Sequence, residues 1–170
     1  MSTPGNTRVF VVRPDSAGSG IPGLPGFQPA PGETAVYVLR DGDMPITPPL
    51  VVLEQTKQAV IALGSLPAHT REQDVYVMAP TLITADFTFS SITPDTSTMR
   101  AAIQAQLAAF FADGVDFEES VSEAAYLSAL YATRDLTTGQ VLAGFTLSTP
   151  TDDIAVPLGG IAALGAVTFA

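Results

Sequence analysis

The sequence predicts an α+β fold of two small mixed α/β subdomains, ordered β-β-α-β and then β-α-α-β-β, with mixed or antiparallel sheets. Runs rich in β-branched and aromatic residues alternate with segments whose apolar residues recur at helical spacing. A chain of 170 residues can hold one ordinary domain or two small ones. The Ala79-Pro80 break then divides the chain into subdomains at residues 1–79 and 80–170.

The first subdomain is expected to contain three strands and one helix. Two strands are predicted at residues 7–13 (TRVFVVR) and 34–40 (TAVYVLR), and a third at residues 75–78 (VYVM). A helix is predicted at residues 47–64, with two prolines in its first turn and Gly64 as its stop signal. The apolar side of this helix comprises Val52, Leu53, Val60, Ile61 and Leu63.

The connection between the first two strands, residues 14–32, is rich in proline and glycine. Its core, SGIPGLPGFQPAPG, has no apolar periodicity, so it is predicted to be an extended loop without regular structure. Loops longer than about 12–15 residues are usually functional or mobile. Ile21, Leu24 and Phe27 are the candidates within it for contact with a partner protein.

The second subdomain is expected to open with a strand at residues 82–92, because apolar and polar residues alternate along it. The apolar side comprises Ile83, Ala85, Phe87 and Phe89, and the polar side comprises Thr84, Asp86, Thr88 and Ser90. A helix capped by Thr96 or Ser97 is expected to run to about Ala112. Its buried face is predicted to comprise Met99, Ile103, Leu107 and Phe110.

A second helix is expected from Ser120 to about Arg134, because Ser120 and Glu123 form a capping-box pattern. Its apolar positions are Val121, Ala124, Leu127 and Leu130 or Tyr131. Strands at residues 140–148 and 163–169 are expected to complete the second subdomain.

Composition and charge exclude several classes of protein. An apolar content of 46% excludes a disordered chain. Proline, glycine or charge interrupts every apolar run before it reaches the roughly 18 residues of a membrane span. The formal net charge is -10, and the seven basic residues are scattered. We therefore expect no nucleic-acid partner and no membrane partner, since both need clustered Lys and Arg.

Residues with catalytic potential do not form a recognisable set. The single histidine, His69, has no cysteine and no second histidine with which to hold a metal. Ser65 lies near it in sequence but lacks the G-x-S-x-G pattern of an activated nucleophile. The glycine-rich segment lacks the G-K-[ST] ending of a phosphate-binding loop. We expect no enzymatic activity, no cofactor and no metal.

Two groups of carboxylates remain. The link between the helices of the second subdomain (DGVDFEES) carries Asp113, Asp116, Glu118 and Glu119. Such oxygen clusters can bind Ca²⁺, although the spacing does not match an EF-hand. We interpret Glu118 and Glu119 as favourable charges before the next helix. Asp152 and Asp153 follow Pro150 and are expected to bond to nearby backbone N–H groups in a turn.

The last 24 residues, LSTPTDDIAVPLGGIAALGAVTFA, combine a strand, a proline-marked turn, a connector and a closing strand. This segment resembles the C-terminal signature of the baseplate J-like family, the baseplate wedge proteins of contractile-tailed bacteriophages and prophages. The matching positions are Leu147, Pro150, Asp153, Pro157, Ile161, Ala162, Leu164, Gly165 and Val167. Similar positions in the family's strand junction are Val75, Val77, Ala79, Pro80 and Phe87. The helix after this junction also fits, and Ser120 and Leu127 fit the start of the next helix.

Two features depart from the family pattern. Members generally have a shorter connection between the first two strands, so residues 14–32 resemble an insertion. Full-length members also carry a large N-terminal region. The chain is therefore expected to be a C-terminal fragment that begins at an introduced Met1, or a short homologue.

The resemblance implies a structural component of a phage or prophage contractile-tail baseplate, which takes part in wedge assembly through protein–protein interfaces. The implied partners are other baseplate and tail proteins. The implied location is the virion, with the host cytoplasm during assembly. The isolated fragment is expected to be a monomer that becomes oligomeric in the baseplate.

Two other interpretations remain open. The one nearest to the baseplate interpretation is a subunit of a related contractile injection machine. The alternative is a small ligand- or Ca²⁺-binding α+β module without catalytic activity.

Overall fold

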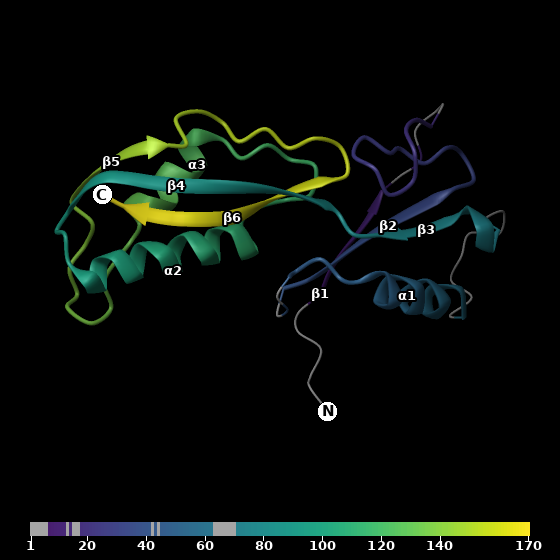
Figure 1. The fold of residues 1–170 in the computed structure, drawn as a ribbon, viewed down its shortest axis with the longest axis horizontal. Helices are drawn as coiled ribbons and strands as arrows, with labels where there is room; N and C mark the ends of the chain where they lie inside the picture. Colours follow the sequence, from purple (N-terminus) through teal and green to yellow (C-terminus); the bar gives the residue numbers. More distant parts are fainter. Residues whose placement is uncertain (1–6, 13, 15–17, 42, 44, 63–70) are drawn as a thin grey trace. The chain divides into compact units, whose positions relative to one another are not determined.

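The structure is a computed structural model that describes residues 7–12, 14, 18–41, 43, 45–62 and 71–170 (Figure 1). Within these residues, three α-helices accompany two three-stranded sheets. The elements follow the order β-β-α-β and then β-α-α-β-β, so the predicted α+β class is confirmed. No described helix is long and apolar enough to cross a membrane.

The chain divides into two compact units. Unit 1 comprises the described residues of Met1–Thr81 together with Pro157–Gly160, and unit 2 comprises Leu82–Val156 and Ile161–Ala170. The sequence placed the division at Ala79-Pro80 and put residues 157–160 in the second subdomain. This short segment belongs to unit 1 because its backbone is bonded there: the carbonyl oxygen of Gly159 accepts from the N–H of Thr81 at 2.9 Å.

The sheet of unit 1 has the order β1-β2-β3, formed by β1 (Thr7–Val12), β2 (Thr34–Arg40) and β3 (Val75–Met78). β2 pairs antiparallel with β1 and parallel with β3, so the sheet is mixed. A 3₁₀ turn at Glu72–Asp74 leads into β3. The five inner residues of β2 are all buried, which explains why its sequence is a continuous apolar run.

Helix α1 (Leu50–Ala62) covers one face of this sheet. The cluster beneath it comprises Leu53 of α1, Val36 and Val38 of β2, and Val77 and Ala79. The helix begins later than predicted, because the carbonyl oxygen of Pro49 accepts from the N–H groups of Val52 and Leu53 and so sets the first turn. Leu63 and Gly64, expected near its end, lie outside the described residues.

The sheet of unit 2 has the order β5-β4-β6, with the long strand β4 (Thr81–Thr93) at its centre. β5 (Gly144–Thr149) pairs antiparallel with β4. β6 (Gly160–Phe169) runs in the same direction as β4, since Asp86 contacts Ala166 and Thr88 contacts Thr168 (Figure 1). β5 is shorter than the strand predicted at residues 140–148, because residues 133–142 form a separate hairpin.

The core of unit 2 lies between β4 and its two helices. The alternation along β4 is confirmed, with Ala85, Phe87 and Phe89 buried and with Thr84, Asp86 and Ser90 exposed. The Phe87 ring meets the edges of Phe111 and Tyr126 at centroid distances of 5.9 and 5.5 Å. Phe111 is buried in place of the predicted Phe110, because it lies one helical turn after Leu107 on the same face.

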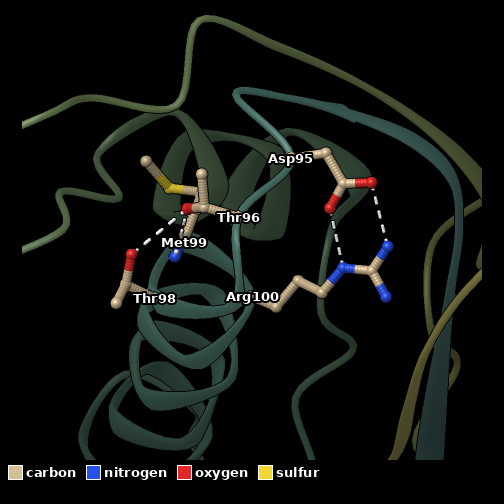
Figure 2. A network of polar contacts seen from close by, with 5 residues as sticks. All are labelled: Asp95, Thr96, Thr98, Met99 and Arg100. Atoms are coloured by element: carbon tan, nitrogen blue, oxygen red, sulfur yellow. Dashed lines mark hydrogen bonds and ion pairs between the residues drawn. The ribbon is translucent and has the colours of Figure 1, made fainter.

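Helix α2 (Ser97–Asp113) has a hydrogen-bonded N-terminus, shown in Figure 2. The Thr96 hydroxyl accepts from the N–H of Met99 at 3.1 Å, so Thr96 is the cap. Arg100 donates two hydrogen bonds to the carboxylate of Asp95, at 2.7 and 2.9 Å. This hydrogen bonding lowers the pKa of Asp95.

Helix α3 (Glu123–Tyr131) begins and ends inside its predicted bounds. Its cap is Ser122, whose hydroxyl accepts from the N–H of Ala125 at 3.3 Å. The expected cap, Ser120, is wrong: its hydroxyl instead accepts from the N–H of Val156 at 3.3 Å. Residues 120–121 therefore pair with a distant segment and do not begin the helix.

That distant segment, residues 150–156, is bound along the start of α3. Val121 and Ile154 exchange backbone hydrogen bonds of 3.0 and 2.8 Å. The carboxylate of Asp153 accepts from the N–H of Glu123 at 2.7 Å. The local turn bond expected for Asp153 is replaced by this contact, because the first N–H groups of α3 need acceptors. The turn at residues 150–153 therefore supplies a hydrogen-bond acceptor to the start of α3.

Candidate functional site

The candidate site is the segment of unit 1 at residues 18–33, which we call the Pro-Gly loop. It contains Pro-Gly three times, and the chain reverses at each pair. The N–H groups of Leu24, Phe27 and Glu33 donate to the carbonyl oxygens of Ile21, Leu24 and Ala30 at 3.0, 3.3 and 2.9 Å. The glycine φ angles are +85°, +84° and +95°. Proline followed by a glycine of positive φ is the pattern of a type II turn.

The described residues of this segment form no helix or strand element, as predicted, but the loop is not extended, because it folds into three tight turns. Proline presets φ near -65° at the second turn position, and glycine reaches positive φ without a Cβ clash. Each residue type weakens a helix or strand, but the pair stabilises a tight turn. The repeated x-Pro-Gly-x pattern is the sequence signal that would have predicted these three turns.

The Pro-Gly loop is closed at its base. Ser19 and Gln28 exchange two backbone hydrogen bonds of 2.9 and 2.8 Å. The N–H of Gly26 donates to the carbonyl oxygen of Leu158 at 2.8 Å. These bonds hold the loop in one conformation and place Leu158 beside it.

Phe27 anchors the loop to the sheet of unit 1. Its side chain is 3% exposed, and its ring meets Tyr76 of β3 at 5.3 Å in an edge-on arrangement. The Glu33 carboxylate accepts from the N–H of Ala30 at 2.8 Å and from the Tyr76 hydroxyl at 3.2 Å. Burial, followed by the negative charge of Glu33, raises the pKa of Tyr76.

The three predicted contact residues therefore separate into two roles. Ile21 is 64% exposed and Leu24 is 54% exposed, so both remain available to a partner. Phe27 is buried, so its predicted role in a partner contact does not fit the structure. Its ring packs against Tyr76 of β3 instead. Leu158, 46% exposed, adds a third apolar side chain near the loop.

The chemistry of the Pro-Gly loop favours recognition of an apolar surface. Residues 18–32 contain no charged side chain. Covering them would therefore desolvate no ion, which is the most costly part of burying a surface. An ordered loop also loses less conformational entropy on binding than a mobile one.

The structure brings none of the described candidate metal ligands together. Ser65 and His69 lie outside the described residues. In the part of the chain that the structure describes, no three His, Asp or Glu side chains group as metal ligands would. Glu118 and Glu119 precede residues 120–122, so they lie outside the first turn of α3. The acidic residue in that turn, where negative charge is favourable, is Glu123.

Neither a scan of protein-family models nor a search of curated proteins matches this chain.

Proposed function

We propose that this chain is a structural component of the baseplate of a phage or prophage contractile tail, that it is not an enzyme, and that it acts in wedge assembly through protein–protein contacts. The ordered resemblance along the chain to the baseplate J-like family supports the proposal. The observation that carries it is the Pro-Gly loop, a hydrogen-bonded segment that carries no charge over residues 18–32 and exposes Ile21 and Leu24.

The loop works as a preformed contact. Full burial of a Leu or Ile side chain is worth about 1.5–3 kcal/mol. Ile21 and Leu24 are roughly half to two thirds exposed, so a neighbour that covers them gains about 1–2 kcal/mol from each. Phe27 and the Ser19–Gln28 bonds supply the rigidity. The proposed partners are other baseplate and tail proteins, in the virion and, during assembly, in the host cytoplasm.

The test is reconstitution of the baseplate with the double variant Ile21→Ser and Leu24→Ser, using the tail proteins encoded beside this chain. We expect incorporation to fall at least about tenfold, which corresponds to about 1.4 kcal/mol. The matched control is Leu50→Ser on α1, because Leu50 is 83% exposed and lies outside the loop.

If the double variant is incorporated as well as the control, the Pro-Gly loop does not form part of the interface. Failure of the unaltered chain to enter any particle would instead contradict the baseplate proposal itself.

A further inference from the structure

A second surface with features of a docking site lies in unit 2, on a hairpin that follows α3. Residues 133–142 fold back on themselves. The backbone N–H of Asp135 donates to the carbonyl oxygen of Gln140 at 2.8 Å, and the N–H of Leu142 donates to the carbonyl oxygen of Thr133 at 3.2 Å. The N–H of Gly139 donates to the carbonyl oxygen of Asp135 at 2.8 Å and closes the turn. We call residues 133–142 the Asp135 hairpin.

The buried carboxylate of Asp135 stabilises the turn of the hairpin by hydrogen bonding. Asp135 is 2% exposed, and its carboxylate accepts from the N–H groups of Thr137 and Thr138 at 2.8 and 3.3 Å. It also accepts from the Thr138 hydroxyl at 2.6 Å. Hydrogen bonds from the hydroxyls of Thr138 and Thr98 lower the pKa of Asp135 to about 2. The carboxylate is therefore ionised at neutral pH, but it is buried within the turn.

The apex of this fixed turn carries an exposed leucine. Leu136 is 92% exposed, the highest value among the exposed large apolar residues. The other such residues of unit 2 are Tyr131, at the end of α3, and Val141, on the same hairpin. A partner that covers the Leu136 side chain would remove its apolar surface from water, which is favourable.

A groove lies beside Leu136. It has a volume of about 470 Å³ and lies between the Asp135 hairpin and α2. Its helical wall includes Ala101, Ala102 and Ala105. The exposed residues of α2 from Ala101 to Ala112 include no charged side chain. Small uncharged side chains let the backbone of another helix approach closely.

Arg134 supplies a charge at the rim of the groove. The other described arginines are all paired: Arg8, Arg40, Arg71 and Arg100 bind Asp41, Asp43, Asp74 and Asp95. Arg134 is exposed and is the one described arginine without an ion pair. The groove is lined by alanines and Leu136 but also by Thr98, Gln106, Thr137 and the buried Asp135. The exposed charge at its rim is the cation of Arg134, which favours a partner that brings a carboxylate.

We propose that this groove binds an amphipathic helix of a partner protein, with its apolar side against Leu136, Ala101 and Ala105 and with an acidic side chain paired to Arg134. The inference does not depend on the baseplate proposal. The acidic net charge disfavours a second copy of this chain as the occupant, because two such copies repel each other.

The test uses the whole chain with labelled alanine and leucine methyl groups, observed by NMR at about 0.15 M salt, where distant charges are screened. The probes are two synthetic 15-residue helical peptides with leucines along one side. One peptide carries a glutamate at the edge of that side, and its twin carries glutamine.

We expect the glutamate peptide to shift the methyl signals of Ala101, Ala105 and Leu136 and to bind about threefold more tightly than its twin, as an exposed ion pair allows. In Arg134→Gln, the two peptides should bind equally. In Leu136→Ser, both peptides should bind more weakly than to the unaltered chain. Arg134 and Leu136 are exposed, so neither change is expected to unfold the chain.

Unchanged methyl signals with both peptides, or equal binding of both to the unaltered chain, would overturn the inference. Light scattering of the chain alone tests whether a second copy of the chain occupies the groove. A dimer that Leu136→Ser abolishes would assign the groove to a second copy and would also overturn it.

Discussion

The carboxylate of Asp153 accepts a hydrogen bond from the N–H of Glu123 across 30 residues of sequence. It supplies an acceptor that the first turn of α3 lacks, beside the local cap Ser122. The turn that resembles the signature of the baseplate J-like family therefore has a structural role in unit 2. It attaches residues 150–156 to the start of a helix.

Replacing Asp153 with alanine should lower the free energy of unfolding by about 1 kcal/mol, the usual cost of losing a helix cap. Urea denaturation followed by far-ultraviolet circular dichroism measures this change. Asp152→Ala is the matched control, because the Asp152 side chain is exposed and, among the described residues, accepts a hydrogen bond from the neighbouring Thr151 hydroxyl alone. Equal losses in the two variants would contradict the capping role.

The Asp135 hairpin should respond to pH with a defined sign. The folded pKa of Asp135, about 2, lies below its ordinary value of 3.8. The stabilisation is therefore complete above about pH 4 and is lost as the pH falls toward 2. The stability difference between the unaltered chain and Asp135→Asn should be largest near neutral pH and should shrink across this range. A constant difference from pH 6 to pH 2 would show that the ionised carboxylate contributes nothing.

Gly165 of β6 should not tolerate a side chain. A Cβ at this position would strike the Asp86 carboxylate and lie 3.1 Å from the carbonyl oxygen of Ala85. The same carboxylate accepts from the N–H of Ala166 at 2.7 Å, so it has little freedom to move. Gly165→Ala should cost roughly 1–3 kcal/mol in unfolding free energy, as overpacking usually does.

Gly144→Ala is the control for that change, because a Cβ on Gly144 of β5 would meet no atom within 4 Å. Chemical denaturation of both variants separates the two cases. A Gly165 variant as stable as the Gly144 variant would mean that the backbone shifts at little cost.

Phe27, which anchors the Pro-Gly loop, should contribute much more to the free energy of unfolding than the exposed residues of the loop. Phe27→Ala removes a buried ring and should lower stability by about 3 kcal/mol. Ile21→Ala changes an exposed side chain and should stay within about 0.5 kcal/mol. Hydrogen exchange at the Gly26 amide gives a local measurement, since faster exchange in Phe27→Ala alone indicates that the loop has opened. Equal exchange in both variants would contradict the anchoring role.

Local patterns predicted most of the elements. β2 and β3 match their predicted bounds because apolar runs fill them, and the cap of α2 is Thr96, one of the two predicted residues. The Pro-Gly turns also have a local sequence signal. Proline and glycine taken singly disrupt helices and strands, whereas the two in sequence stabilise a tight turn.

Contacts between distant residues could not be predicted in the same way. Nothing near Asp153 in the sequence indicates that its acceptor role serves Glu123. The return of Pro157–Gly160 to unit 1 likewise depends on backbone bonds with Gly26 and Thr81, which no local pattern marks. The same holds for the groove beside Leu136, whose walls come from α2 and the Asp135 hairpin.

The most direct test of the central proposal is electron cryomicroscopy of contractile-tail particles made by the genome that encodes this chain. We predict density for the chain in the baseplate, with Ile21 and Leu24 of the Pro-Gly loop buried against a neighbouring protein. Tail particles whose baseplates lack the chain would contradict the proposed function. A baseplate that contains the chain but leaves both residues in solvent would contradict the proposed interface.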